Sequence, residues 1–207
     1  MIIKVCGMRE PENIREVLEL KPDMMGFIFY PKSPRYVQDA ASVKEISFPE
    51  ILIKTGVFVN EEPAIVEKII CDAALDAVQL HGTESPAYCS EIKQLKCAVF
   101  KAFSISEPAD FEQTKQYENK VDGFLFDTKT PAYGGSGVKF DWNMLEYYTG
   151  TTPFLLSGGI GKEDAKAILQ IQHPLLAGID LNSRFEISPA LKNTKDLQYF
   201  IQIIRKK

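Results

Sequence analysis

ILIKTGVFVNEEPAIVEKIICDAALDAVQL, residues 51–80, outlines a strand, a helix and a second strand. The run 51–59 is rich in β-branched and aromatic side chains, which is typical of a buried strand. Apolar side chains then recur at Ile65, Val66, Ile69, Ile70 and Ala73. That spacing places them on one face of a helix, and a second short apolar run follows at 76–80. Because a helix between two strands lets them lie parallel, the stretch predicts a β–α–β unit.

The same alternation continues in both directions from this stretch. Short apolar, β-rich runs occur at Ile2–Cys6, Met24–Tyr30, Ile51–Val59, Asp76–Leu80, Cys97–Phe103, Val121–Asp127, Pro153–Ser157 and Leu175–Asp180. Eight strands alternating with amphipathic helices in 207 residues fit a closed (β/α)8 barrel, or TIM barrel, better than an open doubly wound sheet. We therefore expect the α/β class and a single (β/α)8 barrel domain spanning residues 1–207.

Two proline positions indicate where helices begin. Pro11 suits the first turn of the first helix, where a missing backbone N–H costs nothing. Ser188 and Pro189 resemble an N-cap followed by proline at the first helical position. The last helix, with its apolar face at Leu197 and Phe200, is therefore expected to start at this pair.

The composition is that of an ordinary globular protein, with 45% hydrophobic and 25% charged residues, which excludes disorder as the main state. The formal net charge is −4, from 24 Lys and Arg against 28 Asp and Glu. These charges form no basic stripe, so neither nucleic acid nor a membrane surface is expected as a partner. We expect a small-molecule partner and a chain that is a monomer or a homodimer.

Nothing in the sequence indicates a membrane or an oxidising compartment. No apolar stretch approaches the roughly 20 residues that span a bilayer, and the first residues lack a signal-peptide core. The four cysteines include no C-x-x-C pair, so reduced thiols and a cytoplasmic location are expected. Cys71, Cys89 and Cys97 lie away from the carboxyl ends of the strands and are expected only to pack.

A barrel concentrates its chemistry where the strands end and the following loops begin. The first strand ends at Cys6, where a nearby cation or N–H groups would lower the pKa of the thiol and make a thiolate base. The sixth strand ends at Asp127, where desolvation favours the neutral acid. Cys6 as a small buried hydrophobe and Asp127 as a turn or capping residue are the alternatives, but the pairing favours a catalytic base and acid.

Two adjacent loops predict a phosphate site. The seventh strand leads into Gly158 and Gly159, and the eighth leads into Asn182 and Ser183, with a helix expected after each. Glycines let backbone N–H groups crowd one anion, a helix N-terminus adds a favourable dipole, and barrels often hold phosphate at these two loops. The alternative is that the glycines only make tight turns.

Two further side chains are expected to shape the site. Arg35, held between prolines and aromatic residues, can clamp a carboxylate, with a solvated surface arginine as the alternative. His81, at the end of the fourth strand, is expected to help shape the site, whereas His173 lies at the opposite end and is expected to be structural. No group of histidines and carboxylates has metal-ligand spacing, so we expect no metal.

The longest spacing between strand starts, 32 residues, falls between the sixth and seventh strands. It contains the glycine-rich segment Gly134, Gly135, Ser136 and Gly137. On the catalytic face such a segment favours a lid that excludes water, with a flexible surface loop as the alternative.

The segment Lys4-Val5-Cys6-Gly7-Met8-Arg9 resembles the opening signature of the phosphoribosylanthranilate isomerase family of tryptophan biosynthesis. Further blocks resemble the family's pattern in the same order along the chain: Gly26–Phe29, Ser33–Val37, Gly56–Asn60, Val78–Gly82, Asp127, Gly134–Gly137, Phe140–Trp142 and Ser157–Ile160. Individually several of these blocks are short, but together they are specific.

The resemblance implies an Amadori rearrangement of N-(5-phosphoribosyl)anthranilate to 1-(2-carboxyphenylamino)-1-deoxyribulose 5-phosphate. It also implies Cys6 as general base, Asp127 as general acid and Arg35 facing the anthranilate carboxylate. The product keeps every atom of this phosphorylated aminosugar and no redox step occurs, so no cofactor is expected.

One block departs from the family pattern. Asn182-Ser183-Arg184-Phe185-Glu186 lacks a glycine that many relatives have before the glutamate, so whether Arg184 contributes to phosphate binding is open. Two alternative functions are a histidine-pathway aminosugar isomerase and a non-catalytic barrel that senses a phosphorylated metabolite. The first would need a second phosphate loop, and the second would need no pair of Cys6 and Asp127.

Overall fold

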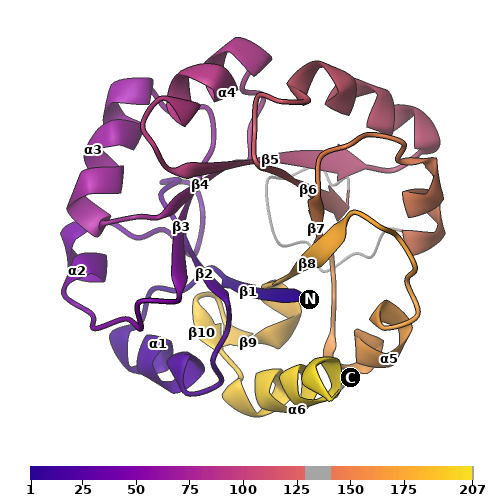
Figure 1. The fold of residues 1–207 in the computed structure, drawn as a ribbon. Coiled ribbons are helices and arrows are strands. Elements are labelled where there is room, and N and C mark those ends of the chain that lie inside the picture. The colour runs from indigo at the N-terminus through magenta and orange to yellow at the C-terminus, as the bar shows by residue number, and fades with distance from the viewer. Residues whose placement is uncertain (129–140, 207) are drawn as a thin grey trace.

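The computed structural model describes residues 1–128 and 141–206, and eight parallel strands close into a barrel in it (Figure 1). The strands are β1 (Ile2–Cys6), β2 (Met24–Ile28), β3 (Ile53–Phe58), β4 (Ala77–Leu80), β5 (Ala98–Ile105), β6 (Gly123–Thr128), β7 (Phe154–Leu156) and β8 (Leu176–Leu181). Each strand pairs with the next along the chain, and β8 pairs with β1. The predicted (β/α)8 barrel is therefore confirmed.

Helical segments surround the ring of strands (Figure 1). The α-helices are α1 (Pro11–Leu18), α2 (Ala41–Lys44), α3 (Pro63–Ala73), α4 (Pro86–Lys93), α5 (Ala165–Ile168) and α6 (Thr194–Arg205). The 3-10 helices are η1 (Pro108–Tyr117), η2 (Trp142–Tyr147), η3 (Lys162–Asp164) and η4 (Ser183–Phe185). Pro11 opens α1 as predicted.

The predicted start of the last helix is wrong. Ser188 ends the short strand β9 (Glu186–Ser188), which pairs antiparallel with β10 (Leu191–Lys192). Helix α6 begins six residues later, where the Asn193 side chain caps it by accepting the Asp196 N–H at 3.2 Å. Ser188 and Asn193 are both suitable N-cap residues. The hairpin holds Lys192, between them, in extended backbone, so the helix starts only after Lys192.

Most observed strand ends differ from the predicted ones, and none differs by more than two residues. β3 begins at Ile53 rather than Ile51, because the Leu52 N–H donates to the Pro49 carbonyl at 3.0 Å and closes a turn that leaves Ile51 exposed. Cys89 is buried and Cys97 half-buried, as packing residues should be. Cys71 is exposed on the outer face of α3, so the prediction that it packs is wrong.

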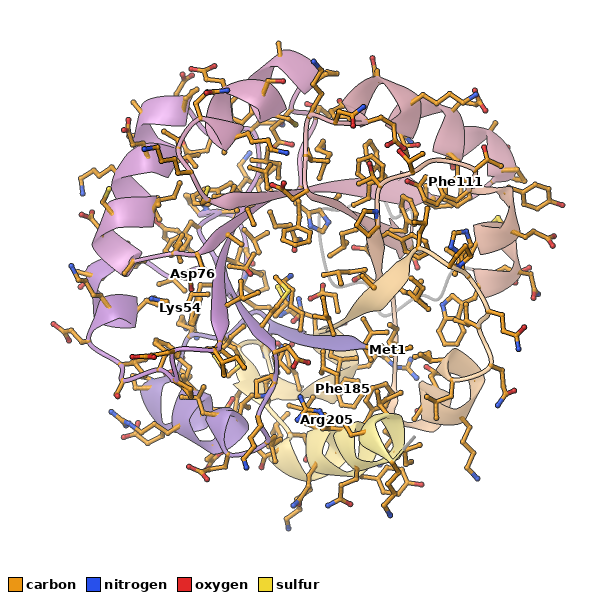
Figure 2. All side chains as sticks on the ribbon, viewed as in Figure 1. Met1, Lys54, Asp76, Phe111, Phe185 and Arg205 are labelled. Atoms are coloured by element: carbon orange, nitrogen blue, oxygen red, sulfur yellow. The ribbon has the colours of Figure 1, made fainter. Side chains whose placement is uncertain are left out.

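The larger apolar core lies between the strands and the helical segments. There Phe111 of η1 packs edge-on against Phe126 of β6, with ring centroids 5.1 Å apart, and Phe185 packs similarly against Phe200 of α6 at 5.2 Å. Figure 2 labels Phe111 and Phe185, which lie between the ring of strands and the helical segments. Edge-to-face pairs of this kind add to the stabilisation that burial alone gives. The outward side chains of each strand therefore fix it to the helical layer.

Side chains alternate along each strand between this outer core and the barrel interior. A small interior cluster is apolar and consists of Met24, Ala102, Leu125 and Leu155. Lys4, Gln79 and Asp180 are buried together in the interior as a polar group. The next inward positions on β1 and after β4 are Cys6 and His81, so the period of two carries these side chains to the open end of the barrel. No helix of the described part of the chain is long and apolar enough to cross a membrane.

Candidate active site

A cavity opens among the carboxyl ends of the strands. The predicted site residues that line it are Cys6, Arg35, His81, Asp127, Gly158, Gly159, Asn182 and Ser183. They come from β1, β6 and the loops after β2, β4, β7 and β8, so the fold brings together side chains that are far apart in the sequence. The expected lid, Gly134 to Gly137, lies outside the described residues.

Cys6 is the last residue of β1 and is only 3% exposed. Gly26 of β2 leaves room for the Cys6 sulfur, because a Cβ on Gly26 would lie 2.6 Å from Cys6 Sγ. Burial raises the pKa of the Cys6 thiol, Lys4 opposes this, and the Asp180 carboxylate adds to it. The expected lowering of this pKa is therefore wrong, because desolvation outweighs the nearby cations.

Asp127 lies near the end of β6, where its side chain faces the cavity. Its Oδ1 accepts the backbone N–H of Thr128 at 2.8 Å. Its Oδ2 lies 3.4 Å from Nε2 of His81, which is longer than an ordinary hydrogen bond. One oxygen of the carboxyl is thus held by the backbone, and the other faces His81 and the cavity.

The sequence does not predict the polar group that forms the floor of the cavity. The Lys4 ammonium donates to Gln79 Oε1 at 2.5 Å and to Asp180 Oδ1 at 2.9 Å, and the Ser157 hydroxyl donates to Asp180 Oδ2 at 3.2 Å. Gln79 Nε2 lies 2.7 Å from His81 Nδ1. Lys4, Gln79 and Asp180 are charged or amide side chains within otherwise apolar strands. Because such side chains are seldom buried without a partner, this pattern in the sequence could have indicated a polar group inside the barrel.

Arg35 lies in the loop after β2 and is 8% exposed, so the alternative of a solvated surface arginine is wrong. Its Nε and Nη2 donate to the Glu186 carboxylate at 2.8 and 2.6 Å, in a two-point ion pair. Gly7, at a φ of +77°, passes beneath it, where a Cβ would meet Arg35 Cδ at 2.6 Å. The carboxylate that Arg35 holds in this structure therefore comes from the chain itself.

Lys192 completes a cluster with Arg35 and Glu186. Its ammonium is fully buried and donates to Glu186 Oε1 and Asn182 Oδ1, both at 2.7 Å. Burial lowers the pKa of Lys192, and Glu186 opposes that shift. Burial would raise the pKa of Glu186, but Arg35 and Lys192 hold it below its ordinary value. Two cations against one carboxylate leave the cluster with a net positive charge beside the cavity.

The loops expected to hold phosphate adopt the glycine conformations that tight backbone turns require. Gly158 has a φ of +87° and Gly159 of +64°, and a Cβ at Gly158 would lie 2.3 Å from Thr128 Oγ1. Long helices do not follow these loops: η3 and the short α5 follow Gly159, and η4 follows Asn182. Arg184 lines the cavity, and its guanidinium pairs with Glu163 at 2.9 Å.

His173 lies away from the cavity, as predicted. Its ring stacks on Tyr148 with centroids 5.9 Å apart, and Nδ1 accepts the Leu175 N–H at 3.2 Å. Within residues 1–128 and 141–206, no group of three or more His, Cys, Asp or Glu side chains is placed to hold a metal ion.

The chain is similar to proteins of one family along almost its whole length. A family model described as N-(5'phosphoribosyl)anthranilate (PRA) isomerase matches residues 3–203. A protein from Parabacteroides distasonis named N-(5'-phosphoribosyl)anthranilate isomerase is 51% identical over 209 residues, which cover 99% of this chain and 93% of that protein.

Solved structures agree with this similarity. The crystal structure of phosphoribosyl anthranilate isomerase from Thermotoga maritima has a TM-score of 0.89 and 34% identity, with 100% of both chains covered. A phosphoribosyl anthranilate isomerase crystallised with reduced 1-(o-carboxyphenylamino)-1-deoxyribulose 5-phosphate has a TM-score of 0.86 and 30% identity, again over 100% of both chains.

Proposed function

Because the chain belongs to the N-(5'-phosphoribosyl)anthranilate isomerase family, it is an isomerase of tryptophan biosynthesis, and we propose that Cys6 and Asp127 are its general base and general acid. The observation that carries this assignment is that both side chains line one cavity, from the ends of β1 and β6. A relative of the same fold was crystallised with a reduced form of the product, which supports the same ligand class for this cavity.

The first step opens the aminosugar ring. Asp127 gives the proton on its Oδ2 to the ring oxygen, the bond from that oxygen to C1 breaks, and the nitrogen lone pair forms the C1=N double bond. The Asp127 carboxylate that remains keeps the Thr128 N–H on Oδ1 and faces His81 with Oδ2. Fixed donors directed at a developing charge stabilise the transition state.

The second step removes the proton from C2. The Cys6 thiolate takes this proton, and the electrons of the C–H bond form a C1=C2 double bond and neutralise the iminium nitrogen. The enaminol then becomes the ketone as its hydroxyl proton leaves and a proton adds at C1. Lys4 and Lys192 lower the pKa of the Cys6 thiol against the effect of burial, so they stabilise the thiolate that this step needs.

The two ends of the substrate meet different groups. We assign the phosphate to the loops that carry Gly158, Gly159, Asn182 and Ser183, and the anthranilate carboxylate to Arg35. The guanidinium of Arg35 is shared with Glu186, and Lys192 supplies the second cation of that cluster. The surplus positive charge supports binding of a substrate anion there. The expected lid, the oligomeric state and the cytoplasmic location stay predictions.

Substitution of the two reacting groups tests the assignment. We expect Cys6→Ala and Asp127→Asn each to lower kcat for N-(5'-phosphoribosyl)anthranilate by at least about 100-fold, since general acid–base groups contribute roughly 10²–10⁴-fold. Cys71→Ala is the matched control, because Cys71 is exposed on α3. Turnover within about threefold of the parent in either site variant would show that its role is wrong, and tight substrate binding without turnover in the parent would favour the sensor.

A further inference from the structure

A row of polar side chains crosses the floor of the cavity and ends at Asp127, the proposed acid. It runs from Asp180 to Lys4 at 2.9 Å, from Lys4 to Gln79 at 2.5 Å, and from Gln79 to His81 at 2.7 Å. It ends at Asp127, 3.4 Å from the His81 ring. The members come from β1, β6, β8, β4 and the residue after β4. Lys4 and Gln79 are 1% and 2% exposed, so water does not compete for the contact between these two side chains.

Lys4 fixes which way the Gln79 amide points. An ammonium group has only donors, so the Gln79 atom 2.5 Å from Lys4 Nζ must be the acceptor, Oε1. The Gln79 Nε2 group, which carries two donors, then faces His81. The same ammonium also pairs with Asp180, which holds it in place on β1.

Gln79 in turn fixes the tautomer of His81. Because an amide NH2 group only donates, His81 Nδ1 must accept with its lone pair at 2.7 Å. The single proton of the neutral ring therefore lies on Nε2, the atom that faces Asp127 Oδ2. The other tautomer would place N–H against N–H at Gln79 and a lone pair against the carboxylate at Asp127.

We propose that Lys4 and Gln79 are positioning residues for the catalytic acid: they hold His81 as its Nε2–H tautomer, which donates to the Asp127 carboxylate once that group has given up its proton. The 3.4 Å contact leaves room for the acid proton on Oδ2, and catalytic hydrogen bonds commonly shorten as the reaction proceeds. The part of this inference that concerns catalysis rests on the proposed role of Asp127, whereas the tautomer does not.

The position of Lys4 links this row to the base as well. Lys4 and Cys6 are two residues apart on β1, so both face the barrel interior. A hydrogen bond and the charge of Lys4 lower the pKa of the Cys6 thiol against the larger effect of burial. One ammonium therefore stabilises the thiolate directly and orients the acid through Gln79 and His81.

The tautomer can be read directly in solution by 15N NMR of the histidine rings near pH 8, where an ordinary histidine is neutral. The chain has two histidines, which makes assignment simple. His173 is an internal reference, since its Nδ1 accepts the Leu175 N–H, and neither ring nitrogen touches the row. We expect the Nδ1 of His81 in the parent to give the shift of an unprotonated nitrogen. A protonated Nδ1 there would overturn the inference.

Gln79→Glu is the sharpest variant, because it keeps an acceptor for Lys4 but removes the N–H group that faces His81. We expect Nδ1 of His81 to gain a proton while His173 stays unchanged. Either resulting form impairs the acid: a neutral ring turns a lone pair toward Asp127, and a charged ring holds Asp127 as the carboxylate with no proton to give. We expect kcat to fall about tenfold or more while KM stays within about threefold, as for loss of positioning rather than of binding.

Thr55→Val is the matched control. Thr55 is fully buried on β3 beside Gly26 and Ala77, and its hydroxyl has no hydrogen-bond partner among the described residues. This nearly isosteric change should leave the His81 shifts and kcat unaltered. An unprotonated Nδ1 in Gln79→Glu, or a kcat within about threefold of the parent, would contradict the inference without touching the proposed roles of Cys6 and Asp127. Those roles are tested separately by Cys6→Ala and Asp127→Asn.

Discussion

Lys4 and Lys101 are both almost fully buried, yet they lie on opposite faces of the barrel sheet. Lys4 faces the interior and binds the side chains of Gln79 and Asp180, which come from two other strands. Lys101 of β5 faces the helical layer, where it donates to backbone carbonyls at Gly82 and Ala102 and pairs with Glu84 at 3.2 Å. Lys101, whose partners are mostly backbone carbonyls, thus stabilises a loop. Lys4, whose partners are side chains from separate strands, instead helps to form the candidate active site.

The pKa values of the two lysines are shifted in opposite directions. Burial alone would lower the pKa of Lys4, but Asp180 and Cys6 outweigh it and raise this pKa above the ordinary value. Burial lowers the pKa of Lys101, and the attraction of Glu84 does not fully compensate. The interior therefore keeps a firmly charged ammonium beneath Cys6, whereas the outer layer tolerates Lys101 at some cost.

The largest expected effect is a difference in kcat between variants of the two lysines. We expect Lys4→Met to lower kcat by about 100-fold, because the variant loses both the cation beside the Cys6 base and the orientation of the acid. Lys101→Met should leave kcat within about threefold. Removing one partner of a buried ion pair costs about 3–5 kcal/mol, so both variants should be destabilised in denaturant unfolding. The cost should be lower for Lys101→Met, since Glu84 keeps the N–H groups of Asn60 and Gly82. Equal kcat in the two variants would remove the distinction.

A smaller effect should appear in the reactivity of Cys6. The Asp180 carboxylate raises the pKa of the Cys6 thiol and Lys4 lowers it, so Asp180→Asn should form the thiolate at lower pH and Lys4→Met at higher pH. At neutral pH we therefore expect several-fold faster alkylation of Cys6 in Asp180→Asn and slower alkylation in Lys4→Met, followed by mass spectrometry of the Cys6 peptide. Glu84→Gln, which alters the partner of Lys101, is the control and should not change the rate. A change in the same direction in both site variants would contradict the assigned charges.

The sequence predicts the strands and their ends better than the contacts beneath them. A period of two and a regular spacing place Cys6, His81 and Asp127 at one end of the barrel without knowledge of any contact. Lys4 was missed as part of the site because its burial depends on Asp180, which is 176 residues away in the chain. A local sequence pattern cannot predict a contact between residues so far apart in the chain.

The same limit explains the other differences. Arg35 was recognised from its own loop, but its partner Glu186 lies 151 residues away on a hairpin that the sequence did not indicate. The local cap signal at Ser188 predicts the wrong start for α6, because a distant contact holds Lys192 in the hairpin: its N–H donates to Asn13 Oδ1 at 2.6 Å. Local chemistry predicts elements and their ends, and tertiary contacts decide between competing local signals.

The smallest effect concerns stability at alkaline pH. Because the pKa of Lys101 is lowered in the folded protein, the unfolded chain binds more protons below the ordinary lysine pKa of about 10.4, so this residue makes the free energy of unfolding rise with pH over that window. The slope is at most about 1.4 kcal/mol per pH unit. For Lys4 the pKa is raised, so its contribution is constant below about 10.4 and is lost only as pH rises through the higher folded value.

Denaturant unfolding at pH 8, 9 and 10 measures this difference. The slope of the free energy of unfolding against pH should be less positive in Lys101→Met than in the parent. Lys192 adds a positive contribution to this slope in both proteins through its lowered pKa, and Cys89 and Cys97 add a negative one through their raised pKa. Lys4→Met should show the same pH dependence as the parent over this range, shifted by a constant loss. If the two variants exchanged these behaviours, the interior ammonium would be the less firmly charged of the two. Lys4 could then not serve as the fixed cation beneath the base.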